Sequence, residues 1–183
     1  DNNRGRLMLV QDATGLRKYE YGSQGEVVKD IRTIIAPGQD NKTYVHRFHY
    51  DTWNRIDTLI YPNKDTLLYK YDLGGNLNFM KAGIQEYIDS IGYDEFEQKV
   101  FCKYGNSTSQ TYTYSPTLRR LSNLVSKDHS GNNMYNLSYT FDKIGNVDSI
   151  HNSAGIISEM GGSYYHKYTY DNFNRISTAH GSW

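Results

Sequence analysis

Short runs of alternating residues recur along the chain and carry the pattern of β-strands. The segment YKYDLGGNL, residues 69–77, places two tyrosines one position apart, so both rings point to the same face of a strand. A polar, glycine-containing stretch follows, and an aliphatic residue then opens a new run. The chain has three prolines and shows no apolar stripe with the 3.6-residue period of a helix. The pattern therefore predicts an all-β fold.

The same motif is repeated seven times. The residues FHYDTWNRIDTL, 48–59, return as YTYDNFNRISTA, 168–179, with six of the twelve positions identical. A unit of about 21 residues recurs, with longer connectors in three places. Because a site is usually needed once, the recurrence indicates a building unit. The copies begin at Tyr19, Phe48, Tyr69, Ile91, Tyr112, Tyr139 and Tyr168.

Each copy also carries residues that favour a tight turn. An aspartate follows the second aromatic position in most copies, and its carboxylate can accept hydrogen bonds from backbone amides two residues on. Glycine or asparagine stands three positions later, where a tight hairpin demands a positive φ. Each unit is therefore predicted to be a β-hairpin. The predicted structural turn residues are Asp51, Asn54, Asp72, Gly75, Asp94, Asp142, Gly145, Asp171 and Asn174.

Two features depart from this simple hairpin. Copy four has Glu97 where the turn glycine belongs, and copy five has Ser115-Pro116 and one extra residue. In addition, the return strands place aliphatic residues three apart, as in Ile56 and Leu59, and strict alternation would send these to opposite faces. Either a β-bulge or a strand that ends early would reconcile this spacing.

Seven hairpins give about fourteen strands in an antiparallel meander. A sheet this wide rarely stays flat, so the tandem hairpins are expected to form a curved, spiral or shell-like sheet. We expect residues 1–183 to be a single repeat region, and the missing initiating methionine leads us to expect a fragment of a larger protein. The two open edges of such a sheet invite self-association.

Composition narrows the function classes. The chain holds 18 tyrosines against six phenylalanines, with only 37% hydrophobic residues, so its interior layers should be amphipathic. Lys+Arg and Asp+Glu both number 20, and the resulting zero charge removes the electrostatic footprint of a nucleic-acid binder. No stretch approaches the roughly 20 apolar residues that a membrane-inserted helix needs. We therefore expect neither a nucleic-acid partner nor membrane insertion.

The iterated pattern Tyr-x-Tyr-Asp-x-x-Gly-Arg-Leu resembles the YD repeat of the Rhs family, which includes bacterial polymorphic toxins, shell components of insecticidal toxin complexes, and teneurins. The resemblance covers Leu16 to Ala179. It implies hairpins wound into a spiral sheet that closes as a cage, with an enclosed effector and the rest of the parent protein as partners. It also implies a secreted or bacterial cell-surface location. The chain has no Asp-Pro dipeptide, so the self-cleavage of toxin members is not carried over.

No constellation of residues predicts catalysis. Glycosidases need two carboxyl groups about 5–10 Å apart, whereas the repeated aspartates predict a row along one sheet edge. His46 and His49 lie three apart on a strand and face opposite ways, which suits a metal ion poorly. The single Cys102 allows no internal disulfide and is interpreted as a small strand residue. No catalytic residue, metal ligand or cofactor is predicted, and we do not expect an enzyme.

Aromatic residues at the turn tips form a candidate binding rim. Its members are Trp53, Phe96 and Phe173. If exposed, these rings would contact a glycan or a protein; alternatively they pack onto the neighbouring hairpin. The favoured hypothesis is a non-enzymatic wall segment of an Rhs-like β-shell that encloses or displays another polypeptide. The alternative is a cell-surface carbohydrate- or protein-binding module.

Overall fold

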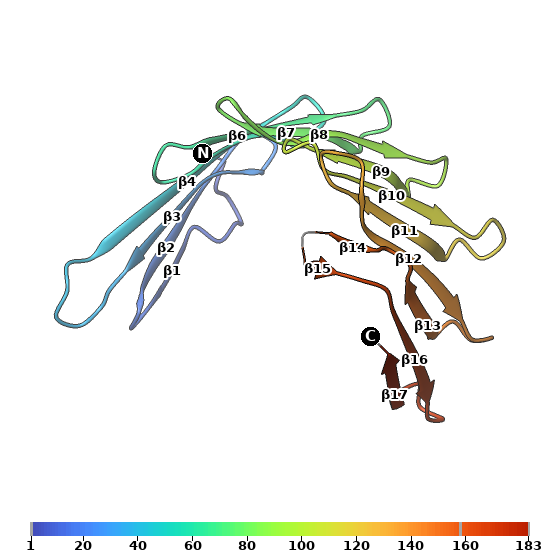
Figure 1. Cartoon of the computed structure of the whole chain (residues 1–183). Coiled ribbons are helices and arrows are strands. Elements are labelled where there is room, and N and C mark those ends of the chain that lie inside the picture. Colours follow the sequence, from blue (N-terminus) through green and yellow to red (C-terminus); the bar gives the residue numbers. More distant parts are fainter. Residues whose placement is uncertain (1, 158, 183) are drawn as a thin grey trace. The chain divides into compact units, whose positions relative to one another are not determined.

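The computed structural model describes residues 2–157 and 159–182 and consists of antiparallel β-strands joined by turns (Figure 1). Two compact units are distinguished, one ending at Glu86 and one beginning at Tyr87. The strands of the first unit are β1 (Leu9–Asp12), β2 (Gly15–Tyr21), β3 (Val27–Ile34), β4 (Lys42–Tyr50), β5 (Ile56–Ile60), β6 (Thr66–Tyr71) and β7 (Leu77–Ala82).

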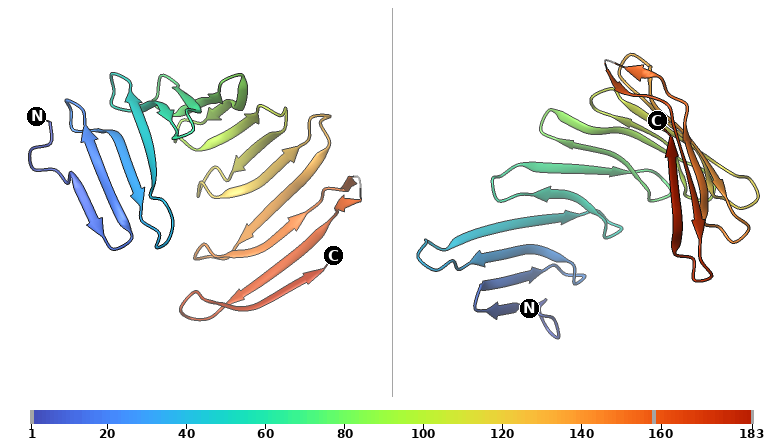
Figure 2. Two further views of the ribbon diagram at one scale, coloured as in Figure 1. Left: turned by 90° about the vertical axis from the view of Figure 1, so that its left-hand side faces the viewer. Right: turned by 60° about the horizontal axis from the view of Figure 1, so that its bottom comes forward.

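The second unit continues the same architecture. It begins within β8 (Gln85–Tyr93), whose first two residues belong to the first unit. The strands that follow are β9 (Lys99–Tyr104), β10 (Ser109–Tyr114), β11 (Leu121–Lys127), β12 (Asn133–Phe141), β13 (Val147–Asn152), β14 (Ile156–Ile157), β15 (Met160–Gly161), β16 (Tyr164–Tyr170) and β17 (Ile176–Ser182). Within each unit every strand pairs with its neighbours in chain order, except that β14 and β15 pair only with each other and β13 pairs with β16. Figure 2 shows the hairpins of each unit standing side by side in one layer.

The prediction of seven tandem antiparallel hairpins is confirmed. The outgoing strand of each hairpin ends at the second aromatic position of its repeat, as β4 ends at Tyr50 and β16 at Tyr170. The return strand opens on the predicted aliphatic residue in all but one copy, where Lys99 opens β9. Fourteen strands belong to these hairpins. Three more strands, β1, β14 and β15, were not expected from the repeat.

A β-bulge in every hairpin explains the aliphatic residues that lie three apart. In the second hairpin Tyr50 pairs with Ile56 and Phe48 pairs with Leu59, so Asp57 is the extra residue of the return strand. The extra residue brings Ile56 and Leu59 to the same face as the two aromatic rings. Register shifts lie at the corresponding position of all seven hairpins. Of the two options that the sequence left open, the bulge is the one realised.

The layer has no closed hydrophobic core. Among the described hydrophobic residues only Ile91, Cys102 and Ala154 are buried. Exposure alternates along β16, where Tyr168 and Tyr170 are half-buried and Thr169 between them is exposed. Neighbouring side chains of the same layer shield the aromatic face in part, so each unit presents two accessible faces.

The joint between β13 and β16 contains the one fully buried asparagine of the described residues. Asn152 accepts hydrogen bonds through Oδ1 from the amides of Asn136 and Ala154, at 2.9 and 3.2 Å, and donates through Nδ2 to the carbonyl of Gly162 at 2.9 Å. These bonds satisfy the buried amide and anchor the loop that carries the β14–β15 ribbon. The sequence indicated only a long connector here.

Candidate functional site

The hairpin turns hold most of the residues that the sequence singled out. In the second hairpin, the carboxylate oxygen Oδ1 of Asp51 accepts hydrogen bonds from the amides of Trp53 and Arg55, at 2.9 and 3.0 Å. The amide of Asn54 donates to the Asp51 carbonyl at 3.0 Å, and Asn54 adopts a φ of 59°. The guanidinium of Arg55 binds the other carboxylate oxygen, with Nε 2.8 Å away. This hydrogen bond and the backbone amides hold the pKa of Asp51 below its usual range.

The other turns repeat this arrangement. The backbone amide four residues beyond the aspartate donates to its carboxylate in each case: Asn76 to Asp72, Gln98 to Asp94, Asn146 to Asp142, and Arg175 to Asp171. Every one of these carboxylates is therefore engaged by its own turn. They lie one per hairpin, and two of them, Asp142 and Asp171 of the last two hairpins, line a common pocket.

The left-handed turn position is kept even where the residue is unusual. Glu97 has a φ of 60° and Arg119 a φ of 55°, in the two copies that depart from the repeat. Gly145 fills the same position with a φ of 104°. A non-glycine residue with this φ costs about 1–2 kcal/mol, so the fold imposes the turn on these two copies.

Tyrosine hydroxyls join consecutive hairpins. The hydroxyl of Tyr50 donates to the carbonyl of Val27, the first residue of the preceding return strand, at 2.8 Å. We call this contact the tyrosine–carbonyl bond. Burial raises the pKa of Tyr50, so its hydroxyl stays a donor across the neutral range. The bond recurs from Tyr71 to Ile56, from Tyr114 to Lys99 and from Tyr170 to Val147.

Arginine side chains fill the space between successive turns. The guanidinium carbon of Arg55 lies 4.3 Å from the ring centroid of Tyr71 on the next hairpin. A Cβ atom added to Gly75 in that next turn would lie 3.3 Å from Nη1 of Arg55. The same guanidinium binds Asp51, so Arg55 connects its own turn to the following one. The ring contact is a cation–π interaction.

The fifth and sixth hairpins show the same contact. Arg120 lies 5.5 Å from the ring centroid of Phe141, and its Nη1 donates to the carbonyl of Asp142 at 3.4 Å. An added Cβ at Gly145 would come within 2.7 Å of Nη2 of Arg120. The close approach of the guanidinium thus explains why this turn carries glycine.

The presence of glycine at the turn of one repeat correlates with an arginine in the preceding repeat. Glycine holds the left-handed position where the preceding repeat, or the segment before β1, supplies an arginine. The pairs are Arg6 with Gly25, Arg55 with Gly75, and Arg120 with Gly145. Where the preceding repeat has no arginine, another residue holds the left-handed position: Asn54 follows a repeat with Glu26, Glu97 follows one with Asn76, and Asn174 follows one with Asn146. Our interpretation of the sequence missed this link, although the alternation of these residues is a readable signal.

The candidate rim residues lie at the turn tips with exposed rings. Trp53 is 71% exposed, Phe96 59% and Phe173 79%. An arginine covers one side of each ring: Arg55 and Arg175 come from the same turns as Trp53 and Phe173, whereas the arginine over Phe96 is Arg119 of the next hairpin. In the second unit, Phe96 and Phe173 share one edge with the exposed residues Leu118 and Ile144, because all four lie in turns that close successive hairpins.

The remaining candidates have structural surroundings. His46 packs edge-on against Tyr61, with 5.6 Å between ring centroids, whereas His49 is exposed. Cys102 is a free, buried cysteine in β9. Among the described residues no group of three or more His, Cys, Asp or Glu side chains is placed to hold a metal ion. Nor does that part of the chain contain a helix long and apolar enough to cross a bilayer.

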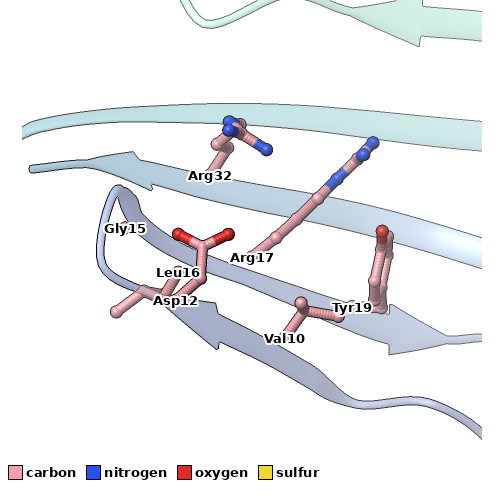
Figure 3. A pocket seen from close by; sticks show the side chains of 7 residues that line it. All are labelled: Val10, Asp12, Gly15, Leu16, Arg17, Tyr19 and Arg32. Carbon is pink, nitrogen blue, oxygen red and sulfur yellow. The ribbon is translucent and has the colours of Figure 1, made fainter.

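A small pocket lies at the start of the first unit, where β1, β2 and β3 adjoin (Figure 3). Its volume is about 170 Å3, and Arg17 and Arg32, which pair across β2 and β3, extend to the same side. The guanidinium of Arg17 is already bound by Asp30, with Nε 2.9 Å from Oδ1, and lies 5.2 Å from the Tyr19 ring. Of the two guanidinium groups in the pocket, that of Arg17 is thus held by Asp30, and that of Arg32 lies near the carboxylate of Asp12.

No family model matches the chain, and no curated protein matches it. Among solved structures, it is similar to the crystal structure of TcdB2-TccC3, at 23% identity and a TM-score of 0.86, over 96% of this chain and 10% of that one. The Photorhabdus luminescens Tc holotoxin pore matches at 22% identity and a TM-score of 0.86, over 96% of this chain and 9% of that one.

TcdB2-TccC3 without its hypervariable C-terminal region matches equally well, at 23% identity and a TM-score of 0.86, over 96% of this chain and 9% of that one. The similar part therefore lies outside that hypervariable region. This chain spans about a tenth of the length of the chains it matches. It has the fold of that part, and the tandem antiparallel hairpins expected from the YD-repeat resemblance are confirmed.

Proposed function

We propose that this chain is a non-enzymatic wall segment of an Rhs-like β-shell that encloses or displays another polypeptide of a larger exported or cell-surface protein. The observation that carries the proposal is the single layer. Hydrophobic burial stabilises most domains, yet among the described residues only Ile91, Cys102 and Ala154 are buried hydrophobic residues. A layer of this kind separates two spaces and does not enclose a core of its own.

The contacts between hairpins suit a wall. The tyrosine–carbonyl bonds and the arginine side chains connect each hairpin to the next beyond the strand pairing itself, so the layer resists opening between repeats. One face carries half-buried aromatic rings, and rings of this kind provide large apolar area with a polar tip. Such a face can cover a polypeptide without a pocket specific for one sequence. The turn aspartates are engaged by their own amides, which supports a role without catalysis.

Protease protection in the parent protein tests the proposal. A segment of the parent that is cut rapidly when isolated should resist a nonspecific protease within the intact parent. Weakening the wall with Tyr50→Phe and Tyr170→Phe should make that segment susceptible at a lower urea concentration. Tyr44→Phe is the control, because the Tyr44 ring is exposed in β4. Equal cleavage rates for the segment alone and within the parent would rule out enclosure.

A second candidate function is supported by the exposed rim. Trp53, Phe96 and Phe173 stand out from the turns with one side of each ring uncovered by arginine, and such rings can stack on sugars or on protein side chains. Glycan-array binding that is lost with Trp53→Ala and kept with Leu73→Ala, an exposed turn residue without an aromatic ring, would favour this module. If no glycan on the array bound, the carbohydrate-binding function would be ruled out.

A further inference from the structure

A guanidinium group occupies three of the six spaces between adjacent turns. Arg55 and Arg120 reach forward to the next hairpin, as described above. Arg6 lies 5.5 Å from the Tyr21 ring and so takes the same place beside the first turn. Between the fourth and fifth hairpins Arg119 reaches back, pairs with Asp94 and lies 5.9 Å from the Tyr114 ring. The edge therefore has a recurrent site for one guanidinium beside the second aromatic ring of a hairpin.

The space between the sixth and seventh hairpins has the same surroundings and lacks the arginine. Asn146 stands where Arg55 and Arg120 stand in their repeats. Its Nδ2 turns to its own Asp142 at 2.9 Å and to Asn174 at 3.3 Å. A cavity of about 260 Å3 remains beside it, far above the roughly 10–15 Å3 that one water needs on this measure. The cavity lies at the turn ends of β12, β13 and β16.

The lining of this cavity is acidic and aromatic. The described residues that line it include Asp142, Asp148 and Asp171, with no lysine or arginine, and the ring of Tyr170. Arg175 balances Asp171, with Nη2 2.7 Å from Oδ2. Asp142 and Asp148 have no cationic partner among the described ion pairs, although the hydroxyl of Thr140 lies 3.3 Å from Asp148. The carboxylates that line the cavity therefore outnumber the guanidinium groups that pair with them.

We propose that this cavity binds the guanidinium group of an arginine side chain from another polypeptide. The ring of Tyr170 takes the place that Tyr71 has for Arg55, and the carbonyl of Asp171 takes the place that Asp142 has for Arg120. Carboxylates and a ring face favour the planar guanidinium over the compact ammonium of lysine. The inference stands apart from the shell proposal, because it needs only the geometry of two adjacent turns.

One difference from the filled sites defines how the ligand enters. Asn174, with a φ of 60°, replaces the turn glycine, so its Cβ keeps a guanidinium away from the turn backbone that Arg120 approaches at Gly145. In exchange its side-chain oxygen lines the cavity as an acceptor. The ligand therefore enters from solvent toward Tyr170 and the carboxylate of Asp148, and not along the path of a built-in arginine.

A peptide titration followed by NMR tests the proposal on the full 183-residue chain. The probe is the blocked tripeptide Gly-Arg-Gly, compared with the same peptide carrying lysine or the neutral isostere citrulline. We expect saturable shifts of the Tyr170 and Asn174 amides with the arginine peptide, and at least about tenfold weaker binding of citrulline, because charge-assisted bonds are the strong ones. Equal binding of the arginine and citrulline peptides, or no saturable shift, would overturn the site.

Two variants test whether the NMR shifts arise from binding in this cavity. Asn146→Arg combined with Asn174→Gly rebuilds the pair seen at Arg120 and Gly145, so it should fill the cavity and abolish peptide binding. Asp148→Asn leaves the cavity open and should weaken the arginine peptide at least about threefold. Asp40→Asn, in an exposed loop, is the matched control and should leave binding unchanged. If both the Asp148→Asn variant and the double variant bound the arginine peptide as tightly as the unchanged protein, the proposal would be contradicted.

Discussion

The hydroxyl of Tyr50 donates to the carbonyl oxygen of Val27 at 2.8 Å and so connects the second hairpin to the first. The acceptor belongs to the first residue of a return strand, next to the bulge, where the strand ladder is locally disrupted. A side chain thus adds a hydrogen bond to a strand carbonyl beside the bulge. Four of the six tyrosines at the second aromatic position make this bond, and Tyr21 donates instead to the carbonyl of Leu7.

Tyr50→Phe should lower the free energy of unfolding by about 1 kcal/mol, because it removes one hydrogen bond and keeps the ring. Urea denaturation followed by circular dichroism measures the change. Tyr44→Phe, at an exposed position of the same strand, should be nearly neutral. Equal effects of the two substitutions would show that the hydroxyl of Tyr50 contributes nothing.

Phe141→Tyr should have the opposite effect. Phe141 is the one second aromatic without a hydroxyl, and the equivalent acceptor is the carbonyl of Leu121, the first residue of β11. A new tyrosine–carbonyl bond there should raise the free energy of unfolding by up to about 1 kcal/mol. Chemical denaturation again gives the answer, and a loss of stability would show that this position cannot accommodate the bond.

Acid should destabilise the protein below about pH 4. Hydrogen bonds from Arg55 and Arg175 hold the pKa values of Asp51 and Asp171 below their usual range. The unfolded chain therefore binds more protons than the folded one, so the stability present above about pH 4 is lost as pH falls through the lowered folded-state pKa values. Asp51→Asn should flatten this dependence in acid titrations of stability, whereas Asp40→Asn should not.

Glu97→Gly should stabilise the fourth hairpin by about 1 kcal/mol, because glycine adopts the φ of 60° without the steric cost that glutamate meets. Glu95→Gly is the matched control in the same turn. Glu95 does not have a positive φ, so glycine there adds only unfolded-state freedom and should destabilise. Thermal unfolding measures the Tm of each variant. A shift of both Tm values in the same direction would contradict the expectation.

Arg120 and Gly145 should show coupled stability effects. Gly145→Asn alone places a Cβ against the guanidinium of Arg120 and should destabilise by about 1–2 kcal/mol. Adding Arg120→Asn recreates the pair that Asn146 and Asn174 form naturally, so the double variant should recover part of that loss. A double-mutant cycle should give a coupling of at least about 0.5 kcal/mol. Additive effects would show that the two residues are independent.

The hairpins could be predicted because their signals are local. Tyr69 and Tyr71 share a face through strand alternation alone, and Asp72 and Gly75 mark a reversal within four residues. The contact of Arg55 with Tyr71 could not be derived in the same way, since it depends on the distance between two hairpins. The buried Asn152 and the small β14–β15 ribbon likewise depend on where a connector folds back.

The sequence by itself determined the number of hairpins, their turns and the side of each strand that carries the aromatic rings, because alternation and tolerance of positive φ act over a few residues. The tertiary structure decided that bulges keep Ile56 and Leu59 on one face, that tyrosine hydroxyls reach the preceding return strand, and that the space beside Asn146 is a cavity. The bulge depends on how the two strands of one hairpin pair around their turn. The other two features depend on how far one hairpin lies from the next, and strand pairing between repeats sets that distance.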